Sequence, residues 1–89
     1  MPKVKFTRAL NRFFPELDEF TSSEESLLDV LLSLDKRHPG LTSYIVDDQK
    51  SLRPHVNIFI DGVINDRKQL GRNVSESKEI YIIQALSGG

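Results

Sequence analysis

The segment that most constrains the fold is the apolar stretch at residues 79–86. In an extended strand, Ile80 and Ile82 point to one side, while Tyr81 and Ile83 point to the other. A strand that is apolar on both sides is typical of a central position in a sheet. We therefore predict a sheet that is built around this strand.

A first strand is predicted at residues 3–7, where polar and apolar side chains alternate and Val4 and Phe6 point inward. Residues 17–21 are a weaker strand candidate, separated from the first strand by a charged loop at residues 8–16. We expect these two strands to pair with each other. The final strand is expected beside the first one, in a mixed sheet.

A hairpin is predicted between these outer segments. Residues 56–60 have the composition of a strand, and the Asp61-Gly62 pair strongly favours a two-residue turn. Residues 63–65 then return along the strand. The polar segment that follows, at residues 66–78, contains Leu70 as an expected anchor to the core.

One helix is predicted over residues 23–38. Ser22 and Glu25 fit a capping box, in which the two side chains satisfy free amide groups of the first turn. Apolar residues then recur at helical spacing, namely Leu27, Val30, Leu31 and Leu34. Pro39 and Gly40 end the helix. Residues 40–54 are expected to be irregular or partly helical.

This element order predicts an α+β domain at residues 1–86, with the helix across one face of a mixed sheet, followed by a tail at residues 87–89. By parity, one set of side chains faces the helix and a second set faces away from it. The first set is Ile58, Ile60, Val63, Ile80 and Ile82; the second is Phe59, Ile64, Tyr81 and Ile83. We expect the second set to form an apolar partner-binding surface. The alternative is that residues 40–54 fold over it.

Composition excludes several classes of function. With 12 basic and 13 acidic residues, the net charge is -1, and no basic stripe suits a nucleic acid. No apolar run is long enough for a signal peptide or a membrane span, so we expect a cytoplasmic protein. The chain has no cysteine, and its two histidines, His38 and His55, are too few for a metal cluster. We expect no catalytic residues, and a carrier or interaction role.

The chain finishes with Ser87, Gly88 and Gly89. Composition alone leaves three explanations open for this ending: a functional tail, an ordinary frayed terminus, or the remnant of a linker. Glycine has no Cβ and tolerates unusual backbone angles, so Gly88 and Gly89 suit a narrow channel in a partner protein. Three extended residues span about 10 Å, which is enough to reach such an active site.

The whole chain resembles the ubiquitin-like sulfur-carrier proteins of the MoaD and ThiS families, which have the β-grasp fold. The residues that carry this resemblance are Val4, Phe6, 27–34, 56–62, 80–86 and the tail at 87–89. Within that family, residues 53–60 are most similar to carriers of the mycobacterial cysteine-synthesis type. Relatives often have Gly-Asp before the last strand, where this chain has Ser77-Lys78.

The resemblance implies a reaction at the Gly89 carboxylate. A partner enzyme of the ubiquitin-activating type would use ATP to adenylate Gly89, and a sulfur donor or sulfurtransferase would convert it to a thiocarboxylate. A biosynthetic enzyme would then accept the sulfur, for molybdopterin, thiamine, cysteine or another metabolite. The chain binds no cofactor in this scheme. Gly88 and Ser87 would thread into the partner's active site.

Two other functions start from the same residues. A ubiquitin-like modifier uses the same adenylate but ends in an isopeptide bond to a lysine of another protein. A plain β-grasp interaction module has a tail without a function. Deletion of Gly88 and Gly89 distinguishes the last case, because a module that only binds other proteins does not need them.

Overall fold

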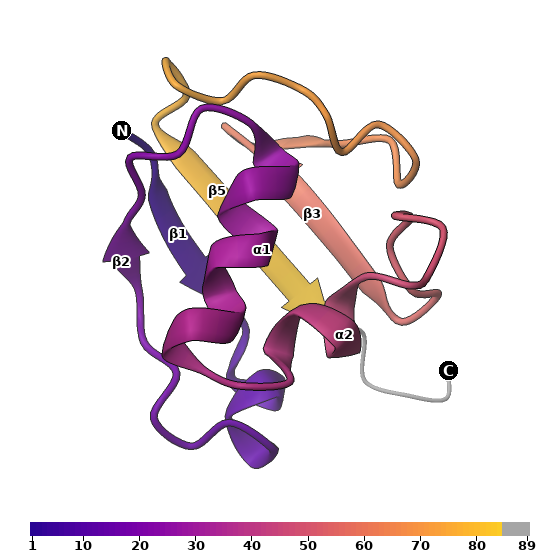
Figure 1. Cartoon of the computed structure of the whole chain (residues 1–89). Helices are drawn as coiled ribbons and strands as arrows, with labels where there is room; N and C mark the ends of the chain where they lie inside the picture. Colours follow the sequence, from indigo (N-terminus) through magenta and orange to yellow (C-terminus); the bar gives the residue numbers. More distant parts are fainter. Residues whose placement is uncertain (85–89) are drawn as a thin grey trace.

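The computed structural model describes residues 1–84 as a five-stranded sheet with three helical segments. The strand order is β2-β1-β5-β3-β4. The strands are β1 (Lys3–Phe6), β2 (Phe20–Thr21), β3 (Val56–Ile60), β4 (Val63–Ile64) and β5 (Glu79–Gln84). As predicted, β5 is central; it runs parallel to β1 and antiparallel to β3. This is the β-grasp arrangement that the resemblance implies (Figure 1).

Both α-helices lie on one face of the sheet. The main helix α1 (Leu27–Arg37) crosses it, and the short helix α2 (Leu41–Ile45) follows at its end (Figure 1). The Thr42 amide donates to the Asp35 carboxylate (2.8 Å), and the Thr42 hydroxyl donates to the Leu31 carbonyl. These bonds tie α2 to α1, so both helices cover the same side. No helix of residues 1–84 is long and apolar enough to cross a bilayer.

The core lies between the helices and this face of the sheet. Four isoleucines of β3 and β5 contribute to it: Ile58, Ile80 and Ile82 are fully buried, and Ile60 is 1% exposed. The helices contribute Leu27, Val30, Leu31, Leu34, Leu41 and Ile45, all fully buried. Leu70 is buried as predicted. The burial of these apolar side chains is the main contribution to the stability of the fold.

The predicted start of the main helix is wrong by four residues. Ser26, not Ser22, is the N-cap: its hydroxyl accepts a hydrogen bond from the Asp29 amide at 3.1 Å. The amides of Leu27 and Leu28, the two residues after this N-cap, donate to carbonyls of the loop at residues 70–72. These contacts are distant in sequence, and they satisfy the first turn without a capping box at Ser22. The Ser22 hydroxyl, which is buried, instead accepts from the Glu24 amide.

Two other segments differ in detail from the prediction. The expected loop at residues 8–16 contains a 3-10 helix, η1 (Arg8–Arg12), and the weak strand at 17–21 shortens to two residues. Asn11 explains the second change, because its side-chain amide donates to the carbonyls of Phe14 and Leu17. The chain is therefore held in a loop as far as Leu17, and its pairing with β1 begins only at Phe20.

Candidate functional site

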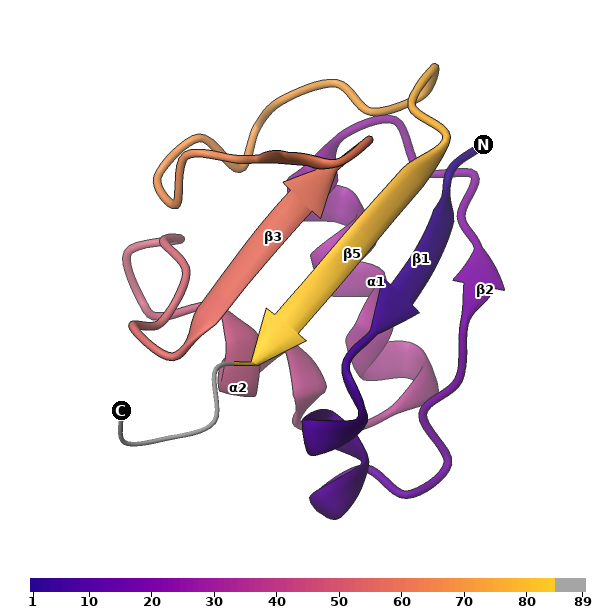
Figure 2. The same ribbon diagram turned by 180° about the vertical axis from the view of Figure 1, so that it is seen from behind.

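The structure places the four residues predicted as a docking surface on the face of the sheet that the helices do not cover. Phe59 lies opposite Ile64 on β4 and opposite Tyr81 on β5, and Ile83 is two residues farther along β5. Ile64 is 55% exposed, and the other three are half-buried. We call these four residues the open-face patch. Figure 2 shows the sheet from this side, with the helices behind it.

Residues 40–54 do not cover the open-face patch. Leu41 and Ile45 are fully buried on the helical side of the sheet, and Leu52 is 3% exposed in the same core. An isolated bridge between Val46 and Leu52 closes the loop that follows α2. The alternative of a second core over the patch therefore does not hold for the residues that the structure describes.

Val63 departs from its predicted environment. Its partner Ile60 faces the helices, which places Val63 on the same side of the sheet. Val63 is nevertheless 64% exposed, whereas Ile60 is almost fully buried. The physical reason is the strand order: β4 is an edge strand, next to β3 only, at the opposite end of the order from β1 and β2.

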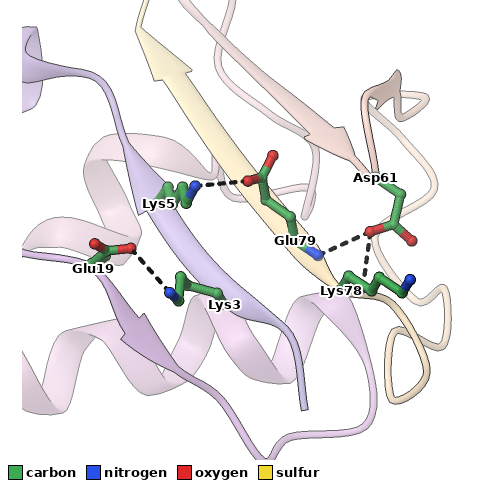
Figure 3. Close-up of polar contacts among 6 residues, drawn as sticks. All are labelled: Lys3, Lys5, Glu19, Asp61, Lys78 and Glu79. Carbon is green, nitrogen blue, oxygen red and sulfur yellow. Dashed lines mark hydrogen bonds and ion pairs between the residues drawn. The ribbon is translucent and has the colours of Figure 1, made fainter.

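Ion pairs border the open-face patch on the side of β1. The Lys5 ammonium lies 2.9 Å from the Glu79 carboxylate, and Lys3 lies 3.9 Å from Glu19 (Figure 3). A hydrogen bond and the negative charge of Glu79 raise the pKa of Lys5. Lys5 is also the β-bridge partner of Tyr81. The apolar patch therefore has a charged rim, an arrangement typical of protein interfaces.

Asp61 joins the hairpin to the start of β5. One of its carboxylate oxygens accepts hydrogen bonds from the amides of Lys78 (2.8 Å) and Glu79 (2.9 Å), as Figure 3 shows. These two bonds lower the pKa of Asp61. Asp61 has a φ of 50° and Gly62 one of 83°, as the predicted turn requires. The turn was predicted from the sequence, but the link from Asp61 to β5 was not.

The predicted reactive tail, Ser87, Gly88 and Gly89, lies outside the described residues, as do residues 85 and 86. The structure does show the surroundings of Gln84, the last described residue. The amide of Gln84, the last residue of β5, donates to the Thr7 hydroxyl (3.0 Å), and the Thr7 amide donates to the Ile82 carbonyl (3.1 Å). Because β1 and β5 are parallel, this end of β5 lies beside η1.

The two histidines have structural positions. The backbone amide of His38 caps the end of α1 by donating to the Leu34 carbonyl at 2.8 Å. The ring of His55 packs edge-on against Tyr44, with the centroids 5.1 Å apart. Within residues 1–84, no three side chains of the His, Asp or Glu types converge on a point where a metal ion could bind.

Comparison with known proteins supports the family resemblance that the sequence indicates. Residues 6–89 match the ThiS family. The chain belongs to the ThiS family. No protein of the curated set matches the sequence.

Three solved structures illustrate the similarity. A chain of the BexX/CysO complex of Amycolatopsis orientalis is 16% identical, with full coverage of both chains and a TM-score of 0.79. CysO of Mycobacterium tuberculosis is 17% identical over 97% of this chain and 100% of its own, with a TM-score of 0.78. Small archaeal modifier protein 1 of Methanosarcina acetivorans is 34% identical over 98% and 94%, with a TM-score of 0.69. The predicted family and the β-grasp fold are thus confirmed.

Proposed function

We propose that this ThiS-family chain is a sulfur carrier whose working group is the carboxylate of Gly89. The observation that carries the proposal is the family match, which extends through residue 89 and so includes the Gly88-Gly89 ending. The described fold also suits a carrier. Its central strand β5 precedes these residues, and no helix among the described residues covers its open-face patch, which can therefore contact another protein.

The chemistry requires a partner. A C-terminal carboxylate has a pKa near 3.5, so it is an anion at neutral pH and a poor electrophile. In the proposed first step, a carboxylate oxygen of Gly89 attacks the α-phosphate of ATP on an adenylating enzyme, and pyrophosphate leaves. The product is a mixed anhydride whose carbonyl carbon has AMP as its leaving group.

Sulfur enters in the second step. Hydrosulfide attacks the carbonyl carbon and AMP leaves, which gives the thiocarboxylate directly. If the donor is a protein persulfide, its terminal sulfur forms an acyl disulfide, and a second thiol must then reduce the sulfur–sulfur bond to release the thiocarboxylate. The thiocarboxylate sulfur is a nucleophile, which a biosynthetic enzyme of cofactor or amino-acid metabolism uses.

The open-face patch is proposed as the surface that the adenylating enzyme and the sulfur acceptor contact in turn. Phe59 and Tyr81 offer aromatic area, and aromatic residues are enriched at protein interfaces. The charged rim of Lys5 and Glu79 would fix the orientation of the partner. Both partners act on the same C-terminal residue, so one surface of the carrier can serve for binding to each of them.

The experiment that tests the proposal compares Gly89→Ala with the wild-type chain in ATP–pyrophosphate exchange catalysed by the cognate adenylating enzyme. We expect the variant to lose most of the exchange, because a methyl group at this position obstructs a channel shaped for glycine. Lys68→Ala, at an exposed loop position, is the control and should exchange normally. Equal exchange by Gly89→Ala and wild type would contradict the proposal.

A protein modifier is the second candidate, and one observation favours it: the relative at 34% identity is named a small archaeal modifier protein. The two functions differ in the product formed from the adenylate. Because Lys78 is the last basic residue, trypsin leaves residues 79–89 attached to any modified lysine. A search for this eleven-residue remnant in digests of cell protein detects a modifier, whereas a thiocarboxylate on the free chain identifies a carrier.

A further inference from the structure

A groove lies at the end of the sheet beside the last residue of β5, apart from the open-face patch. It encloses about 570 Å³ and is lined by Arg8, Ala9, Asn11, Arg12, Phe13 and Gln84. Gln84 is paired with Val56, whose side chain is buried on the helical side, so Gln84 faces away from the patch. We call this feature the η1 groove, because most of its lining belongs to η1 and the residue after it.

One wall of the groove is a preorganised aromatic side chain. Phe13 is 56% exposed, although it is a large apolar residue. Its ring packs on Tyr44, with the centroids 5.5 Å apart, and Tyr44 in turn packs edge-on with Phe14 and His55 at 5.8 and 5.1 Å. Phe13 therefore presents a supported apolar surface, and little side-chain freedom remains to be lost when a partner binds.

The groove also carries positive charge that its own lining does not neutralise. Arg8 and Arg12 are both exposed, and none of the six lining residues is acidic. Within residues 1–84, neither arginine lies within ion-pair distance of a carboxylate. The chain as a whole has a net charge of -1, so this is a local concentration of positive charge.

Gln84 and Asn11 are the uncharged polar residues of the lining. The side-chain oxygen of Gln84 is buried and has no hydrogen-bond partner among the described residues. Because this oxygen is buried, a donor in the groove reaches it only if the Gln84 side chain turns outward, so no hydrogen bond to a partner is assigned to Gln84. Asn11 has a different role, because its side-chain amide already holds the loop after η1 in place.

We propose that the η1 groove binds an acidic segment of the adenylating enzyme. In this complex, carboxylates of the enzyme pair with Arg8 and Arg12, and an apolar side chain packs on Phe13. An enzyme that takes up the residues after Gln84 must approach this end of the sheet, which is why the segment is assigned to it. The inference rests on the proposed function.

The test is charge reversal at the groove. In ATP–pyrophosphate exchange at varied carrier concentration, Arg8→Glu with Arg12→Glu should raise the KM for the carrier by about tenfold or more and leave kcat unchanged, because rim charges act on association. The matched control reverses two exposed charges elsewhere, Lys50→Glu with Lys68→Glu, and should change KM less than twofold. Added salt should raise the KM of wild type but not that of the groove variant.

The possible outcomes separate the two proposals. If wild type supports exchange and the groove variant has the KM of wild type, the groove inference is wrong while the carrier function stands. If wild type supports no exchange with any adenylating enzyme of its cell, both are wrong. The milder pair Arg8→Gln with Arg12→Gln, checked for a wild-type unfolding midpoint, should raise KM by a smaller factor and guards against a folding defect.

Discussion

The two faces of the sheet are made from the same strands but have opposite properties. Along β5, Ile82 points to the helices and is fully buried, while its neighbour Ile83 points the other way and is half-buried. Along β3, Ile58 is fully buried, and Phe59 is half-buried beside Ile64 and Tyr81. One face therefore stabilises the domain, and the other remains available for a partner. Paired substitutions can separate these two roles.

The largest effect is expected from neighbouring isoleucines of β5. Ile82→Ala removes a fully buried side chain and should lower the free energy of unfolding by roughly 2–5 kcal/mol. Ile83→Ala, on the open face, should cost about 1 kcal/mol, because its side chain is only half-buried in the folded chain. Urea denaturation of both variants measures the difference. Equal losses would mean that the two faces are equally important for stability.

The second substitution addresses binding. Phe59→Asp places a charge in the open-face patch and should weaken binding to the adenylating enzyme by about tenfold or more, as expected for a central aromatic of an interface. Val63→Asp is the matched control, because Val63 is 64% exposed but lies on the other side of the edge strand. Isothermal titration calorimetry measures both. A folded Phe59→Asp variant with wild-type affinity would rule out the patch.

The smallest effect concerns Asp61, whose carboxylate links the hairpin to the start of β5. Its pKa is lowered in the folded chain by the amides of Glu79 and Lys78, so its charged form stabilises the fold above the unfolded pKa. That contribution is lost as the pH falls from the unfolded-state pKa, about 4, through the lowered pKa of the folded chain. Asp61→Asn keeps an acceptor oxygen and tolerates the positive φ, but it cannot titrate.

The difference in unfolding free energy between wild type and Asp61→Asn should therefore be largest near neutral pH. It should shrink toward zero as the pH falls into the acid range. Asp47 also has a lowered pKa, through hydrogen bonds from the amides of Ser51 and Gln49. Its protonation at low pH destabilises wild type and Asp61→Asn equally. The difference between the two denaturation series isolates Asp61. A gap that stays constant from neutral pH into acid would contradict the role assigned to its charge.

The sequence was sufficient for the parts of the fold that depend on local patterns. The alternation in β3 and β5 predicts which side chains share a face, and Asp61-Gly62 predicts the turn. The start of α1 was not predictable in this way. Ser22 and Ser26 offer the same capping chemistry four residues apart, and contacts with residues 70–72 decide between them.

The η1 groove was also beyond sequence reasoning, because Phe13, Tyr44, His55 and Gln84 come from four separate segments. From the sequence, Arg8 and Arg12 fit two interpretations: charges on a solvated surface, which is the default, or contacts to an acidic patch of a partner. The available signal was the Phe13-Phe14 pair next to two arginines, inside a segment that was expected to be a loop. Only the parallel pairing of β1 with β5 brings that segment next to Gln84.

The carrier function is tested most sharply by the intact mass of the chain after incubation with its adenylating enzyme, ATP and a sulfur donor. The proposed function predicts a species heavier by the difference between one sulfur and one oxygen atom, located by fragmentation at Gly89 and absent when ATP is omitted. An unchanged mass, although the enzyme forms the adenylate, would contradict a sulfur carrier.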